Sequence, residues 1–503
     1  MSPSMVFTQN GGTLSLREIP QHTPERFAQA LLSALAAGWR VVSYFGVPDD
    51  EGIRLFCLLS LKGHGTIGVM STLVTGKRFP SLTADAPQLH LFEREIAEQF
   101  SLDLEDHPWP KPVRFAPALG SLPGETPQPP QQIGIMDFYR VEGEEVHEVA
   151  VGPVHAGIIE PGHFRFQCFG EEVMHLEISL GYQHRGVEAM MQGRPGERLR
   201  KLSETMAGDT TIGHGTAYAM IVEGITETRV PARAQAVRGI ALELERLANH
   251  TGDLGAISGD VGYLPTASFC GRIRGDFLNM TAALCGSRFG RDLVLPGGVR
   301  FDLSQEGARQ LTDRIRTARD EVKNAVDLLW DAPSVMARLE GTGTVSMQTA
   351  LELGLVGPAG RASGLNRDIR RDHPFGIYTM SQIPVETAKG GDVYARTMVR
   401  WLEMEKSLDF IEEQLRQLPG VAVSNPVGQP AAERLAVALT EGWRGEICHV
   451  ALTDERGDFR RYKVTDPSFH NWSGLAMALR GGQISDFPLC NKSFNLSYCG
   501  FDL

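Results

Sequence analysis

The sequence is short of paired cysteines, long apolar runs and excess positive charge. Its seven cysteines are scattered and none is spaced as CxxC, a pattern typical of reduced cytosolic thiols rather than of a disulfide framework. No apolar stretch approaches the ~18 uninterrupted residues that a membrane-spanning helix needs. The 61 acidic and 49 basic residues give a formal net charge of −12, which opposes binding to the phosphate backbone of nucleic acids.

What the sequence does contain is typical of a globular protein. With 503 residues, 42% of them hydrophobic and 22% charged, the chain has room for roughly two or three separate cores. Its start has no basic segment leading into an apolar run, as a secretory signal would have. We therefore expect a cytoplasmic protein that lies at the inner face of the cell membrane through contacts with other subunits.

Residues 1–115 are expected to form a small α/β domain. Thr23 and Pro24 precede apolar residues at helical spacing, which predicts an N-capped helix. Three β-rich runs follow, at 41–47, 53–61 and 66–74. Residues 116–143 are predicted to be an extended linker, because their prolines and small polar residues show no hydrophobic period.

Residues 144–503 are expected to form a second, mainly helical domain with β segments at its ends. Short β-like runs open it, at 144–151 and 163–169. Apolar residues then repeat at helical spacing in three long stretches, at 231–249, 304–333 and 392–418. The predicted fold class is therefore α+β: a small α/β domain, a proline-rich linker and a larger domain built around a helical bundle.

Several motifs resemble those of a known family of respiratory subunits. The FERE sequence at 92–95, followed by DHP at 106–108, resembles the 30-kDa-type subunit of complex I. Residues 152–188 resemble the opening of the 49-kDa-type subunit of complex I and of the large subunit of group 4 hydrogenases. The IEPGH and NKSFNLSY sequences favour the formate hydrogenlyase or hydrogenase-4-like branch. The resemblance implies two fused subunits, the second with a nickel-iron hydrogenase large-subunit fold.

The resemblance also shows what is missing. In this family a nickel-iron site is held by four cysteine thiolates from two CxxC motifs, because soft sulfur ligands suit these metals. Ala207 and Thr210 stand at the cysteine positions of the first motif, and Ser497 and Gly500 at those of the second. Cys499 is one position out of register, and a single thiolate cannot hold the cluster. The resemblance therefore implies no metal and no cofactor in this chain.

Complex I places a quinone headgroup in the corresponding cavity, where a tyrosine and a histidine bind it. The alignment puts Gly208 at the tyrosine position and Pro161 where the histidine would fall. A quinone or other carrier would therefore have to bind differently. Dinucleotide binding has little support, because no GxGxxG follows a predicted strand.

Acidic and histidine residues around these motifs could still move protons. Glu160 falls on the hydrogenase glutamate that exchanges protons with the metal, and Asp260 on an acidic residue that complex I pairs with its loop histidine. With Asp209 and His214 they form the candidate catalytic relay, since buried carboxylates tend to have shifted pKa values. The alternatives are a loop carboxylate satisfied by backbone amides for Glu160 and a helix cap for Asp260. Other residues are assigned to the cavity or to partner contacts, with structural roles as the alternative: His163, His184, Arg185, Arg370, Asp372, His373 and Arg444.

Three functions remain open. The first is a subunit of a membrane-associated, complex I-like or hydrogenase-4-like oxidoreductase that couples electron transfer at a partner's iron-sulfur cluster to proton movement. The second is a redox enzyme that uses a quinone or other carrier in the altered cavity, and the third is a structural scaffold. Whether the chain is itself an enzyme stays open. The resemblance implies three kinds of partner: an iron-sulfur small subunit like the 20-kDa subunit of complex I, a ferredoxin-like subunit and antiporter-like membrane subunits.

Overall fold

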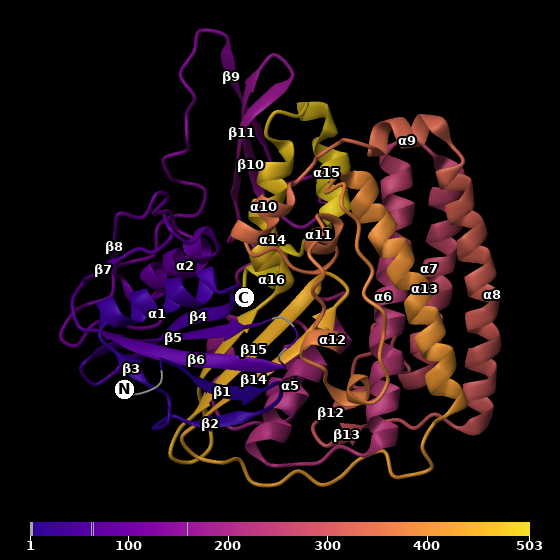
Figure 1. The fold of residues 1–503 in the computed structure, drawn as a ribbon, viewed down its shortest axis with the longest axis horizontal. Coiled ribbons are helices and arrows are strands. Elements are labelled where there is room, and N and C mark those ends of the chain that lie inside the picture. The colour runs from indigo at the N-terminus through magenta and orange to yellow at the C-terminus, as the bar shows by residue number, and fades with distance from the viewer. Residues whose placement is uncertain (1–3, 62, 64, 158) are drawn as a thin grey trace.

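The structure is a computed structural model that describes residues 4–61, 63, 65–157 and 159–503. Figure 1 shows a sheet with helices at the N-terminal side, a bundle of long helices at the opposite side and a second sheet between them. A narrow three-stranded sheet projects from the rest of the molecule. The mixture of helices and sheets confirms the predicted α+β class.

The N-terminal sheet has the strand order β1–β6–β5–β4, with β3 parallel to β6. It contains the three predicted β runs, and its strands are β1 (Val6–Gln9), β3 (Gln21–His22), β4 (Arg40–Asp49), β5 (Gly52–Ser60) and β6 (Thr66–Val74). Helix α1 (Pro24–Ala36) begins as predicted, because the Thr23 hydroxyl accepts a hydrogen bond from the Arg26 N–H. Helix α2 (His90–Phe100) lies near α1 (Figure 1), beside the strand pair β7 (Arg78–Pro80) and β8 (Asp103–Glu105).

Both faces of the N-terminal sheet are buried. Side chains alternate along a strand, so Tyr44 and Leu55 share one core with Phe27 of α1. Phe45 and Phe56 belong to another core that includes Leu439 of the second sheet. The N-terminal sheet is therefore packed between its own helices and the C-terminal part of the chain.

The second sheet carries residues from both ends of the chain. Its order is β16–β15–β14–β2, all antiparallel, with β14 (Arg434–Gly442), β15 (Gly445–Thr453), β16 (Phe459–Thr465) and β2 (Thr13–Ser15). Gly442 pairs with Gly445, so β14 and β15 form a hairpin with Trp443 and Arg444 at its tip. This hairpin reaches the candidate site.

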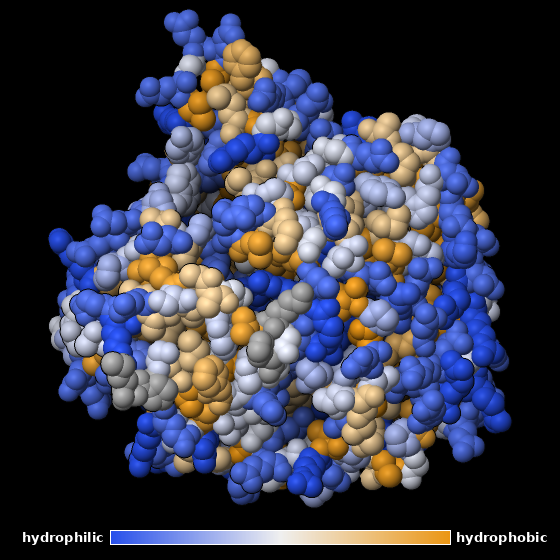
Figure 2. Space-filling model, viewed as in Figure 1, coloured by the Kyte–Doolittle hydropathy of each residue, from blue (hydrophilic) through white to orange (hydrophobic). Residues whose placement is uncertain are grey.

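Four long helices form the bundle: α6 (Ala232–Asp260), α7 (Leu264–Cys285), α8 (Gln305–Trp330) and α13 (Val393–Arg416). Helix α6 was predicted to end near residue 249, and this was wrong. Gly252, Gly255 and Gly259 weaken its intrinsic helix propensity. A Cβ at Gly255 would lie 2.8 Å from Cys270 of α7, so these glycines allow close helix packing that overrides propensity. The outer side of α8 is hydrophilic, at the right of Figure 2.

The projecting sheet has the order β11–β10–β9, with β9 (Val146–Val151), β10 (His163–Phe169) and β11 (Glu172–Ser179). It matches the two predicted β runs. Residues 106–145, which include the predicted linker, form no helix or strand. Among the described residues, no helix is long and apolar enough to cross a membrane.

Short elements complete the fold. The helices are α3 (Val187–Met190), α4 (Glu197–Ser203), α5 (Thr211–Ile225), α9 (Pro333–Leu339), α10 (Met347–Glu352), α11 (Gly357–Ala362), α12 (Ile369–Asp372), α14 (Pro467–Leu479), α15 (Phe487–Phe494) and α16 (Tyr498–Phe501). The 3₁₀ turns and the last strand pair are η1 (Pro87–Leu89), η2 (Gly376–Thr379), η3 (Ile484–Asp486), β12 (Val294–Leu295) and β13 (Gly298–Val299).

Candidate functional site

Arg444, at the tip of the β14–β15 hairpin, joins the two degenerate metal motifs. Its guanidinium donates to both carboxylate oxygens of Asp209, at 2.7 and 2.8 Å, and to the Asn495 carbonyl at 2.5 Å. It also stacks on Trp443, 3.8 Å from the ring centroid. Burial alone would raise the pKa of Asp209, but the charge and hydrogen bonds of Arg444 lower it. An ion pair therefore holds together the region where the family has its metal.

The four ligand positions carry no thiol and have been closed by other contacts. Ala207 is buried, and the Thr210 hydroxyl donates to Asp209 at 3.0 Å. The Ser497 hydroxyl accepts the Gly500 N–H at 2.9 Å and caps α16. A Cβ added to Gly500 would lie only 2.7 Å from a carboxylate oxygen of Asp466. The last ligand position thus has no space for a side chain.

Cys499 is the one thiol beside these positions. Burial, followed by the charge of Glu160, raises its pKa to about 11, and a single thiol supplies only one of the four soft sulfur ligands of a nickel-iron cluster. The residues present therefore do not fit a nickel-iron cluster. Across residues 4–61, 63, 65–157 and 159–503, no group of three or more His, Cys, Asp or Glu side chains is arranged to hold a metal ion.

Glu160 lies against the second motif. Its carboxylate accepts the Tyr498 N–H at 3.2 Å and the Cys499 N–H at 3.5 Å. Both contacts are with backbone amides, and they place Glu160 against the second degenerate motif. Asp502 accepts N–H groups from Gly181 and Gln183, and burial raises its pKa to about 7. No sequence motif pointed to Asp502.

His214 belongs to a separate, fully buried chain of polar groups. Its Nε2 lies 3.1 Å from Asp466, and its Nδ1 lies 3.0 Å from His449 Nε2. The other nitrogen of His449 lies 2.8 Å from the Tyr462 hydroxyl. Burial lowers the pKa of His449 well below its usual value. The hydrogen bonds beyond His214 can run in either direction, because each ring nitrogen and the Tyr462 hydroxyl can donate or accept.

Asp260 is placed apart from the other relay candidates. It is the exposed last residue of α6, and among the described residues it forms no hydrogen bond or ion pair with Glu160, Asp209 or His214. Partial burial raises its pKa, while Lys492 of α15 acts in the opposite direction. The structure therefore brings together Glu160 and Asp209 around the degenerate motifs and leaves Asp260 outside.

Glu245 of α6 is a further titratable group that sequence reasoning missed. Its carboxyl accepts the N–H groups of Ile212 and Gly213, at 2.7 and 3.2 Å, in the first turn of α5. Burial is the main cause that raises its pKa to about 8, and Asp209 adds to the effect. Glu245 is therefore protonated at neutral pH. Its neighbours Glu243 and Arg246 are charged as well, so no local pattern distinguished Glu245.

Three predicted contact residues support the loops around the site. Arg185 donates to the carbonyls of Thr205 and Met206, directly before the first motif. His184 Nδ1 lies 3.3 Å from the Asp502 carbonyl. His163 Nδ1 lies 3.2 Å from the Gly152 carbonyl, within the β9–β10 connection. All three side chains therefore contact backbone carbonyl groups of these loops.

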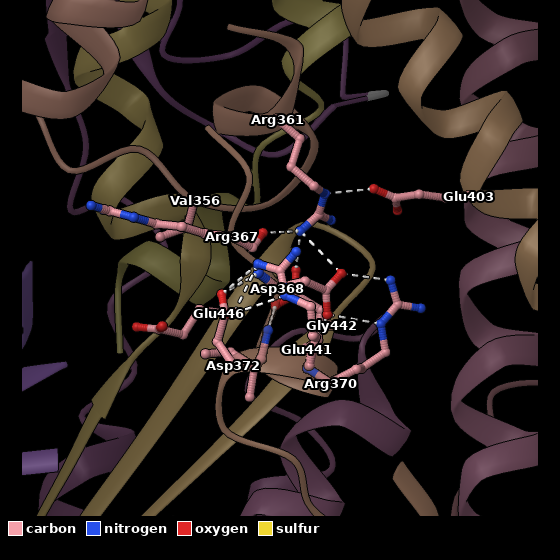
Figure 3. Close-up of polar contacts among 12 residues, drawn as sticks. Val356, Arg361, Arg367, Asp368, Arg370, Asp372, Glu403, Glu441, Gly442 and Glu446 are labelled. Carbon is pink, nitrogen blue, oxygen red and sulfur yellow. Dashed lines mark hydrogen bonds and ion pairs between the residues drawn. The ribbon is translucent and has the colours of Figure 1, made fainter. Parts of the chain in front are cut away.

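A network of buried ion pairs surrounds Glu441 of β14 (Figure 3). Arg361 of α11 donates to Glu403 of α13 at 2.7 Å and to Glu441 of β14 at 2.8 Å. Arg370 of α12 donates to Asp368 at 2.7 Å and to Glu243 of α6 at 3.1 Å. The predicted residues Arg370, Asp372 and His373 are buried in this region rather than at the degenerate motifs.

The fold and this site define a large subunit of the hydrogenase and complex I type. The family model of the 49-kDa subunit of respiratory-chain NADH dehydrogenase matches residues 260–431. Formate hydrogenlyase subunit 5 of Escherichia coli (strain K12) is 31% identical, over 84% of this chain and 76% of that protein. The carbon monoxide-induced hydrogenase of Rhodospirillum rubrum is 33% identical, over 69% of this chain and 97% of that protein.

A solved structure is similar as well. A chain of the membrane-bound sulfane sulfur reductase, an archaeal respiratory membrane complex, matches with a TM-score of 0.66 and 26% identity, over 73% of this chain and 100% of that one. The chain belongs to the family of large subunits that group 4 hydrogenases share with respiratory complex I.

Proposed function

We propose that this chain is a coupling subunit of a membrane-associated, complex I-like or hydrogenase-4-like oxidoreductase and has no nickel-iron centre of its own. Electron transfer at a cluster in an iron-sulfur partner, reduced through a ferredoxin-like subunit, changes the protonation of the cavity. Antiporter-like membrane subunits move protons in response. One observation carries the proposal: Arg444 and Asp209 form an ion pair between the degenerate motifs, while titratable groups remain around them.

The pKa values around the site support proton exchange. Burial raises the pKa of Glu245 to about 8 and that of Asp502 to about 7, close to the pH of a cell. A negative charge added to a nearby cluster favours protonation of such groups, because buried charges interact strongly. Glu160, Asp209 and His214 complete the proposed relay. Asp260 joins it where a partner subunit covers the end of α6.

The midpoint potential of the partner's cluster, measured in the purified complex, tests the coupling. We expect it to fall as pH rises, by up to about 59 mV per pH unit for a one-electron, one-proton step. Glu160→Gln and Glu245→Gln should weaken this dependence, and the exposed Glu455→Gln is the control. A scaffold role would instead be supported by two results together: a midpoint potential that is independent of pH, and proton translocation that neither Glu160→Gln nor Glu245→Gln changes. Stoichiometric nickel in the purified chain would contradict the absence of a metal centre.

A redox enzyme with a carrier in the cavity is the second candidate. The observation that favours it is Gly208, which stands at the family's quinone-tyrosine position: a Cβ added there would have no atom within 4 Å. Gly208→Trp should fill this space and abolish reduction of short-chain quinones by the complex, whereas Gly76→Trp, at another open surface position, should not. Equal rates in both variants would exclude a carrier at Gly208.

A further inference from the structure

A cavity of about 310 Å³ lies where the N-terminal part of the chain meets the C-terminal part. Helix α2 and residues 108–113 form one side of this junction cavity, and β11 and α14 form the other (Figure 1). We propose that the junction cavity binds a small organic acid, with an apolar body and one carboxylate that pairs with Arg94. This binding site does not depend on the coupling function proposed above.

The size and the lining of the junction cavity are those of a small-molecule site. Such sites have volumes of roughly 300–1,000 Å³, mostly apolar walls and a few polar groups. A water molecule takes about 30 Å³ of liquid, so a cavity of about 310 Å³ holds a ligand of roughly ten non-hydrogen atoms. The apolar side chains of the lining include Leu91, Leu176, Leu180, Trp472, Met477 and Phe501. The body of the ligand is therefore apolar.

Arg94 of α2 is the polar group that selects an acid. Its Nε and Nη2 donate to the carbonyl groups of Lys111 and Pro112, at 2.6 and 2.9 Å. In the part of the chain that the structure describes, Arg94 forms no ion pair and its Nη1 has no hydrogen-bond partner. Burial lowers the pKa of Arg94 to about 10, although the charges of Glu98 and Glu177 act in the opposite direction. A ligand carboxylate at Nη1 supplies the close counter-charge that this cation lacks.

The other charges around the junction cavity also favour an anion. Glu177 is the acidic residue of the lining, and Lys111 neutralises it in an ion pair of 2.8 Å. Arg480, exposed directly after α14, lines the cavity as well, and its Nη2 lies 3.4 Å from His175 Nδ1. Like Arg94, it pairs with no carboxylate among the described residues. The cavity therefore has an excess of positive charge.

Arg94 also borders a second cavity, next to the linker residues 128–131. Two carboxylates, Glu98 and Asp103, and two cations, Arg94 and Lys111, line this second cavity. Their formal charges cancel, so it offers an anion no net attraction. Helix α14 lines only the junction cavity, which allows the two cavities to be tested separately.

Buried polar groups in the wall of the junction cavity lack partners. Trp472 and Ser179 line it and are only 3% and 5% exposed. Trp472 Nε1 and Ser179 Oγ have no hydrogen-bond partner among the described residues. Burying a polar group without a partner is unfavourable. An oxygen of the ligand can accept hydrogen bonds from these groups once the side chains that cover them shift. This observation is independent of the charge of Arg94, and it also indicates a ligand.

Calorimetric titration of the full-length chain with octanoate, an acid of the size derived above, tests the proposal. We expect one saturable site with a Kd below about 1 mM. Octan-1-ol has the same apolar chain without the charge and should bind at least about tenfold more weakly. Arg94→Gln should weaken octanoate binding by the same factor and leave octan-1-ol binding unchanged. Arg309→Gln, exposed on α8, is the matched control and should change neither.

Ala476→Phe provides a second measurement if Arg94→Gln does not fold. Ala476 of α14 lines the junction cavity, so the added ring should abolish binding of both octanoate and octan-1-ol. Ala283→Phe, exposed on α7, is its control and should bind both compounds as the wild type does.

Four results would each overturn the proposal. They are a wild-type chain without saturable octanoate binding, equal affinities for octanoate and octan-1-ol, and octanoate binding that Arg94→Gln or Ala476→Phe leaves unchanged. The fourth is octanoate binding to the isolated chain that is lost in the assembled complex, because a partner subunit would then occupy the junction cavity.

Discussion

The ion pair between Asp209 and Arg444 should contribute measurably to stability, and a double-mutant cycle with Asp209→Ala and Arg444→Met measures it. Hydrogen bonds to charged groups contribute about 1.5–3 kcal/mol each, and this pair makes two, at 2.7 and 2.8 Å. The Arg444 side chain is 5% exposed but that of Asp209 is 33% exposed, so solvent screening reduces the sum. We expect a coupling free energy of about 2 kcal/mol.

The assay is urea-induced unfolding at pH 7 of the wild type, the two single variants and the double variant. The surface pair of Arg17 and Glu433, with side chains 80% and 43% exposed, is the control and should give at most about 0.5 kcal/mol. The Arg444 guanidinium lowers the pKa of Asp209. Its contribution is therefore fully present above the ordinary aspartate pKa and is lost only as pH falls through the lowered value. Additive single variants, within about 0.5 kcal/mol, would refute the assigned role.

Three further outcomes are expected. The pKa of Glu245 is raised from 4.5 to about 8, so the free energy of unfolding should fall as pH rises from 4.5 to 8. The loss is at most about 5 kcal/mol, which is 3.5 pH units at 1.36 kcal/mol each. Glu245→Gln should therefore flatten the pH dependence of thermal unfolding. A steeper dependence in the variant would contradict this. Gly500→Ala places a Cβ against Asp466 and should lower the free energy of unfolding in urea by about 1–3 kcal/mol. The control is Gly420→Ala, which has open space around it and should lower that free energy by less than about 1 kcal/mol. Cys499, with a pKa raised to about 11, should react with iodoacetamide at pH 7 much more slowly than a free thiol. A rate equal to that of glutathione would show that the pKa of Cys499 is not raised.

Local sequence signals predicted the local elements. The cap at Thr23 and the apolar period after it were sufficient for α1, and Ser304 and Asp392 likewise cap α8 and α13. These features depend on neighbours within one turn, so the chain carries them without tertiary information. The end of α6 was missed because packing against α7, which no local pattern reports, stabilises a glycine-rich turn of helix.

The candidate site was predictable only in part. The motif positions gave Asp209, Glu160 and Arg444, and the structure places all three around the degenerate motifs. Asp466 and His449 could not be found from sequence, because the first lies 252 and the second 235 residues from His214 along the chain. The position of Asp260 at an exposed helix end was equally inaccessible, since alignment fixes a residue type and not its surroundings.

What the sequence alone determined is which atoms are available: no thiol at the four ligand positions, no polar group at Gly208 and a set of carboxylates and histidines nearby. The tertiary structure decided which of those groups are charged. Glu243 and Glu441 are both buried glutamates, yet Arg246 and Arg370 lower the pKa of the first to about 2 against the effect of burial, whereas burial raises that of the second to about 7. The difference is the balance of charges around each carboxylate: Arg246 and Arg370 both contact Glu243, whereas Glu441 has Arg361, which it shares with Glu403, and lies near the negative charge of Asp368. Burial penalises a charge, and only sufficient close opposite charge offsets that penalty.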